Sequence, residues 1–267
     1  MEEPRYIRWL VEESNVTLSD GTHIPCYRLD HTKDEETLNE GALHLRRHYE
    51  SDESIKKSII DTGLSVAEYL RDYVLPGTQN LAAACRSGDF TEILVSDLLE
   101  FVHHYKVPRC KQQNRANKNR STQGTDIIGY NYANPDGTAS TKDELVAAEV
   151  KGILSSGSYK VLAKAAKDSQ EDEFRWATTL NYYRLHFHKK GDDEEAKRIA
   201  RFMRKPEGQF RIRYLGVGVT SLGQIKDGLI SDYNSDDLML STGHEIFFIH
   251  GKKLMALAND LYARCMQ

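Results

Sequence analysis

Paired cysteines, long apolar runs and a strong net charge are all missing from this 267-residue sequence. The four cysteines, at positions 26, 85, 110 and 265, form no Cys-x-x-Cys pair, which argues against a zinc cluster and a disulfide framework. No run of about 18 or more apolar residues occurs, so neither a transmembrane helix nor a membrane association is predicted. The acidic N-terminus has no apolar signal core, so we expect a reduced, cytoplasmic protein.

The net charge of the chain is small, but basic residues are concentrated in one region. The net charge of −4 gives no global indication of nucleic-acid binding, so such a site would have to be local. From residue 101 to residue 125 no acidic residue occurs, and six basic residues lie among Asn, Gln and Ser. We predict that this basic loop contacts a phosphodiester backbone through Lys111, Arg115, Lys118 and Arg120. The alternative is an ordinary solvated loop.

The basic loop leads into a segment, residues 124–151, that is typical of a β-hairpin. Both of its ends are rich in β-branched and aliphatic residues, and the Asn-Pro and Asp-Gly pairs at 134–137 favour a turn between them. Asp126 begins the first strand, and Glu149 and Lys151 share one face of the second because they lie two residues apart. Unpaired charges are costly inside a sheet, so this set indicates a divalent-metal site.

A helix with an acidic side chain is predicted before the loop. The pattern predicts one helix over residues 78–85 that stops at Ser87-Gly88, and a second, capped by Asp89, over residues 90–105. Glu92 would then lie in the first turn, where the helix dipole favours a carboxylate. A structural role is the commoner explanation for such a residue. If the helix packs against the hairpin, however, Glu92 could orient a metal-bound water or complete a second metal site.

These residue types fit metal-dependent hydrolysis of a phosphodiester. Mg²⁺ prefers oxygen ligands, so we predict Asp126 and Glu149 as ligands, joined by Glu92, and expect Mn²⁺ to substitute. A bound metal would activate water and neutralise charge on the phosphate, and Lys151 would orient that water or stabilise negative charge. The predicted catalytic residues are therefore Asp126, Glu149, Lys151 and Glu92.

Helical and strand patterns alternate along the rest of the chain, which favours an α/β fold with a central mixed sheet flanked by helices. Residues 1–60 are rich in acidic side chains and carry no recognisable chemistry. We expect this segment to be an N-terminal extension that either is simply solvated or docks a partner, followed by the catalytic domain in residues 61–267.

Asp126 followed by Glu149-x-Lys151 resembles the PD-(D/E)xK motif of the restriction-endonuclease-like superfamily, with Thr125 where the motif has proline. The Gln-x-x-x-Tyr element of the RecB-type branch is not found after Lys151. Residues 88–94, 124–126 and 149–152 also resemble the HamA family of the Hachiman anti-phage defence system. That resemblance implies a restriction-endonuclease-like core and a metal-dependent DNase. It also implies a helicase partner, HamB, that holds the DNase in a heterodimer and releases or activates it upon infection.

Two other functions stay open. One is a nuclease of the same fold that acts in DNA repair or cleaves RNA. The other is a non-catalytic nucleic-acid-binding scaffold, against which the intact set of Asp126, Glu149 and Lys151 argues.

Overall fold

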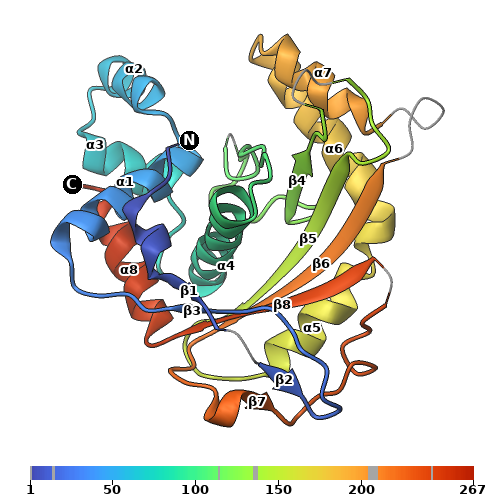
Figure 1. Cartoon of the computed structure of the whole chain (residues 1–267). Coiled ribbons are helices and arrows are strands. Elements are labelled where there is room, and N and C mark those ends of the chain that lie inside the picture. The colour runs from blue at the N-terminus through green and yellow to red at the C-terminus, as the bar shows by residue number, and fades with distance from the viewer. Residues whose placement is uncertain (1, 14–15, 114, 135–137, 204–209, 242) are drawn as a thin grey trace.

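The computed structural model describes residues 2–13, 16–113, 115–134, 138–203, 210–241 and 243–267. A six-stranded mixed sheet forms the centre of the molecule, and helices cover both of its faces (Figure 1). This arrangement confirms the predicted α/β class and is consistent with a restriction-endonuclease-like core. Across the sheet the strands are β1 (Leu10–Glu12), β3 (Cys26–Leu29), β8 (His244–Gly251), β6 (Arg211–Thr220), β5 (Glu144–Ile153) and β4 (Ile127–Asn131).

Strand direction divides this sheet into a parallel centre and two antiparallel edges. The four central strands β3, β8, β6 and β5 run parallel, whereas β1 and β4 pair antiparallel with their neighbours. A parallel centre is buried on both faces, which is why its strands read as nearly continuous apolar runs such as Ile246–Ile249. A separate two-stranded sheet pairs β2 (Thr17–Leu18) with β7 (Leu229–Ile230).

The helices form one layer on each face of the sheet. On one face lie α4 (Asn80–Asp97), α1 (Glu35–Tyr49) and α8 (Leu254–Arg264); on the other lie α5 (Lys160–Ser169) and α6 (Asp172–Lys189), with α7 (Asp193–Arg201) packed on α6 (Figure 1). The shorter helical elements are η1 (Arg5–Trp9), α2 (Asp52–Thr62), α3 (Val66–Tyr69), η2 (Leu70–Val74), η3 (Leu98–Val102) and η4 (Lys226–Gly228). Among the described residues, none of the helices combines the length and hydrophobicity needed to cross a bilayer.

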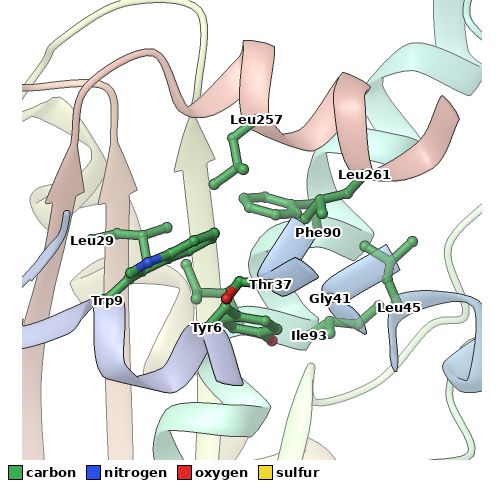
Figure 2. Close-up of a pocket in the computed structure, with 11 residues that line it drawn as sticks. Tyr6, Trp9, Leu29, Thr37, Gly41, Leu45, Phe90, Ile93, Leu257 and Leu261 are labelled. Carbon is green, nitrogen blue, oxygen red and sulfur yellow. The ribbon is translucent and has the colours of Figure 1, made fainter. Parts of the chain in front are cut away.

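The segment 1–60 belongs to the same sheet and core as the residues after it. Its strand β3 pairs with β8, and its helix α1 packs against α8. Figure 2 shows Tyr6 and Trp9 of this segment, together with Phe90 of α4 and Leu257 of α8, around an apolar cavity of about 20 Å³. Such a space holds about one water molecule, so the interface is close-packed. A functional boundary at residue 60 and a docking role for the segment stay predictions.

Candidate active site

The antiparallel pairing of β4 with β5 confirms the predicted hairpin, although residues 135–137 of its expected turn lie outside the described part of the chain. In the register, Ile127 lies opposite Ala148, so Asp126 comes to lie across from Glu149 at the point where β4 begins. Asp126 is further fixed by its Oδ2 atom, which accepts a hydrogen bond of 2.9 Å from the backbone N–H of Val150. The hairpin therefore brings together two carboxylates that are 23 positions apart in the sequence.

Glu149 and Lys151 lie side by side on one face of β5, as their spacing predicts. The Lys151 ammonium contacts Glu149 Oε1 and lies 3.0 Å from Asp168 Oδ2 on α5. Glu149 is 5% exposed, and its Oε2 atom is buried without a hydrogen-bond partner. Burial, reinforced by the nearby charge of Asp126, raises the pKa of the Glu149 carboxyl. An unsatisfied, desolvated carboxylate oxygen is a group that a cation would stabilise.

Glu92 lies on α4, which is one continuous helix rather than the two that the sequence predicts. Asp89 does not cap a second helix: it is fully buried and bonds Tyr49 and Arg115. Gly88 is consequently an interior helical residue, and Glu92 lies about three turns from the helix N-terminus, too far to benefit from the dipole.

A glycine in β5 allows α4 to approach the hairpin. A Cβ atom on Gly152 would lie 2.7 Å from Thr91 Cγ2, closer than side chains tolerate. Thr91 directly precedes Glu92 in α4. The close contact of Thr91 with Gly152 therefore places Glu92 near β5, beside Asp126 and Glu149. Glu92 itself is 6% exposed and accepts a hydrogen bond from Gln112 Nε2.

Lys111 occupies the space between the helix and the hairpin. Its Nζ atom lies 2.5 Å from Asp126 Oδ1 and 3.4 Å from Glu92 Oε2, and the residue is 5% exposed. Lys111 was predicted to bind nucleic acid; the structure places its ammonium among the acids of the candidate site.

The charges of these residues depend on one another. Burial raises the pKa of Glu92 to about 8; the Lys111 charge opposes this shift, and the Asp126 charge adds to it. Burial lowers the pKa of Lys111, but the charges of Glu92, Asp126 and Glu149 outweigh burial and raise it overall. Lys111 therefore stays cationic and partly neutralises an otherwise strongly acidic cluster.

The remaining residues of the basic loop differ in their exposure. The guanidinium of Arg115 is buried and forms two hydrogen bonds of 2.7 Å with Asp89, so it ties the loop to α4. Lys118 is partly buried, with its ammonium on the carbonyl of Arg71. Arg120 is exposed. Nucleic-acid binding by the loop stays a prediction, and Arg120 is the member of the predicted set whose side chain is most open to solvent.

The donor set suits magnesium chemically. Glu92, Asp126 and Glu149 offer only carboxylate oxygens, which Mg²⁺ prefers, and the buried Glu149 Oε2 needs a positive partner. Within the described residues, tight groups of three ligand atoms form at Glu13, Cys26 and His250 and at His44, His48 and Asp97, and not at these three acids. The ammonium of Lys111 lies between two of the three predicted ligands.

Two acidic residues of the site are not recognisable from the sequence. Asp168 contacts Lys151 from α5, as described above. Asp172, at the start of α6, accepts a hydrogen bond of 2.8 Å from Thr125 Oγ1, and burial raises its carboxyl pKa to about 7. Neither residue belongs to a motif, because both are brought to the site by helices that follow the hairpin.

Comparison with known proteins adds the family. A search of curated proteins finds no match. The family model described as HamA, the family of the Hachiman anti-phage defence systems, matches residues 4–265, nearly the whole chain. The chain therefore belongs to the HamA family and is a component of the Hachiman type of defence system.

Proposed function

We propose that this HamA protein is a metal-dependent nuclease that hydrolyses phosphodiester bonds of DNA. The observation that carries the proposal is the assembly of Asp126, Glu149 and Lys151 on two adjacent strands, with one Glu149 oxygen buried and unpartnered. A buried carboxylate oxygen without a hydrogen-bond partner is costly for a merely structural site. It is useful where a cation has to be held.

Asp126 and Glu149 would hold Mg²⁺, or Mn²⁺ in its place, and Glu92 would complete the set of oxygens. When bound, the metal supplies an activated water and neutralises charge on the phosphate. The backbone N–H of Val150 keeps Asp126 oriented toward the site. Gln112 does the same for Glu92. These contacts fix two of the three carboxylates before any substrate arrives.

Lys151 would act on the substrate side of the site. It is more exposed than the carboxylates, with 21% of its side chain accessible. Burial lowers its pKa, but the hydrogen bond to Glu149 and further acidic contacts outweigh burial, so its pKa is raised and it stays charged. A fixed ammonium there can stabilise negative charge developing on the phosphate or orient the attacking water.

The proposed partner is the helicase subunit HamB. Membership of the HamA family supports this proposal, since resemblance to that family implies a helicase partner. A free nuclease of this kind would damage its host, so we expect HamB to hold the chain in a heterodimer and to restrain it until infection.

The nuclease proposal is tested by incubating plasmid and linear DNA with the purified chain, alone and with HamB, in Mg²⁺, Mn²⁺ or EDTA. Glu149→Gln and Lys151→Met should each lower cleavage by about a hundredfold or more, because each removes a charge from the reacting centre. Matched controls are Glu194→Gln and Lys160→Met, which make the same changes at exposed positions on α7 and α5 and should cut normally.

Circular dichroism would establish that the inactive variants remain folded. Cleavage that persists in both Glu149→Gln and Lys151→Met would refute the assignment. Cutting of RNA but not of DNA would refute the substrate and favour the RNA-cleaving alternative.

A further inference from the structure

A groove of about 700 Å³ adjoins the candidate site. Lys111 and Thr125 line it, and both also contact the acidic cluster, so the groove and the site are continuous. Its opposite wall is formed by residues of α6. A group bound in the groove would therefore lie beside whatever is bound at Asp126 and Glu149.

The α6 wall presents aromatic rings to solvent. Phe174, Thr178 and Tyr182 follow one another at intervals of four residues, so they share one face of the helix, and all three line the groove. Phe174 is 82% exposed and Tyr182 is 40% exposed. Phe174 therefore offers a free ring for stacking, whereas the Tyr182 ring also contacts Tyr183 and His186 and is open on part of its surface.

The groove floor is firmly attached to this wall. The backbone N–H of Thr125 donates a 3.0 Å hydrogen bond to Thr179 Oγ1 of α6, and Thr125 Oγ1 bonds Asp172 of the same helix. Gly124 adopts a positive φ of 108°, and a Cβ there would lie 2.5 Å from Thr179 Oγ1. The distance between the aromatic wall and the start of β4 is therefore fixed by contacts that leave no room for adjustment.

The lining of the groove is polar as well as aromatic. Among its described lining residues there are two basic side chains and no acidic one; Lys111 is paired with Asp126 and Glu92, and Arg175 with Glu171. Thr122, Gln123 and Thr178 add uncharged hydrogen-bonding groups. Exposed aromatic faces beside polar groups are features with which proteins hold the bases of single-stranded nucleic acid.

We propose that this groove binds an unpaired base of the DNA strand under cleavage and stacks it on Phe174 and Tyr182. The inference rests on the proposed nuclease function of the adjoining site. A base inside a duplex has both faces covered by its neighbours, so only a base that has left the stack can occupy such a groove. The substrate is accordingly single-stranded DNA, or duplex DNA that has been opened locally.

Binding can be tested without cleavage, with Ca²⁺ in place of Mg²⁺ and three fluorescent probes: a short oligothymidylate, an abasic oligomer of equal length, and a duplex. Phe174→Ala should weaken oligothymidylate binding about tenfold, the usual effect of losing one stacked base. Binding of the abasic oligomer should change by less than about twofold, because this probe has no bases to stack and its phosphate contacts do not involve Phe174. Leu185→Ala is the matched control, since Leu185 is 43% exposed on the same helix but does not line the groove.

Unchanged oligothymidylate binding by Phe174→Ala and Tyr182→Ala would overturn the inference. Equal losses on the thymidylate and abasic probes would also overturn it, because they would indicate backbone contact without stacking. Loss of HamB binding alone would assign the aromatic wall to a protein interface instead. The two proposals can fail separately. A chain that binds oligothymidylate through Phe174 but does not cut DNA in Mg²⁺ would support the groove proposal and refute the nuclease proposal. A chain that cuts DNA equally well with and without the Phe174 ring would support the nuclease proposal and refute the groove proposal.

Discussion

At the scale of single residues, Lys111 is held more tightly than any surface lysine would be. Its ammonium is the shared cation of Glu92 and Asp126, and removal of one partner from a buried ionic group leaves uncompensated charge. We predict that Lys111→Met lowers the free energy of unfolding by about 3 kcal/mol when metal is absent. Urea unfolding in EDTA measures this loss.

The same variant tests metal binding without an activity assay. Lys111→Met removes the ammonium that partly neutralises Glu92 and Asp126, so Mg²⁺ should raise the melting temperature of the variant more than that of the wild type. Lys160→Met, at an exposed position, should respond as the wild type does. Equal Mg²⁺ responses in Lys111→Met and wild type would contradict metal binding at these acids.

Local rules explain which site residues the sequence could place. The sequence could predict the proximity of Asp126, Glu149 and Lys151, because strand alternation and turn chemistry act over a few residues. The place of Lys111 could not be foreseen, since it depends on where α4 packs against β5. Asp168 and Asp172 depend in the same way on helices that return to the hairpin after it has formed.

At the scale of elements, the contact between α4 and β5 sets the position of Glu92. We predict that Gly152→Ala destabilises the fold by about 1–3 kcal/mol, because the new methyl group would overlap Thr91 Cγ2. Thr91→Ala in the same chain removes that overlap and should restore part of the loss. Chemical denaturation of the two single variants and the double variant gives the coupling between them.

Gly88→Ala is the control on the same helix, because nothing lies within 4 Å of its added Cβ. It should stabilise the fold by up to about 1 kcal/mol through helix propensity. Additive effects of Gly152→Ala and Thr91→Ala would mean that the two residues do not meet.

The length of α4 also shows where propensity gives way to tertiary contacts. Ser87, Gly88 and Asp89 are typical of a helix end and a new cap, so local rules predict a break at this point. In the folded chain the Asp89 carboxylate accepts hydrogen bonds from Arg115 and Tyr49, so it is not available to cap a helix N-terminus. The helix then continues through Gly88, because burial of its apolar residues outweighs the cost of one glycine.

At the scale of the whole molecule, the buried cluster of His44, His48 and Asp97 contributes to the response to acid. Burial lowers the pKa of His44 to about 3 and that of His48 well below its ordinary 6.5, and the Arg109 charge adds to both shifts. Burial raises the pKa of Asp97 to about 7, with Arg109 opposing. Below about pH 6.5 the unfolded chain therefore takes up two histidine protons that the folded chain refuses, whereas the folded chain retains one extra proton at Asp97.

Glu92, Glu149 and Asp172 also have raised pKa values, so they act with Asp97 against the two histidines. We therefore predict only the histidine contribution, which lowers the free energy of unfolding as the pH drops from about 6.5 toward 3. Urea titrations across this range measure the slope. His44→Gln removes one of the two histidine contributions, so relative to the wild type it should gain stability as the pH drops through this range. His23→Gln, at an exposed position, should follow the wild type. A His44→Gln titration that runs parallel to the wild-type titration would contradict the assignment.

The strands cannot join the sheet in the order in which they are synthesised. The last strand along the chain, β8, lies between β3 and β6, so the first strands join the rest of the sheet only through it. A nascent chain that has not yet made residues 244–251 holds β1 and β3 as a detached pair, and contacts between such distant segments form slowly. An activity that requires the complete sheet is thereby delayed until nearly all of this chain has been made. For the proposed nuclease, this strand order would keep the complete sheet from forming until synthesis of residues 244–251.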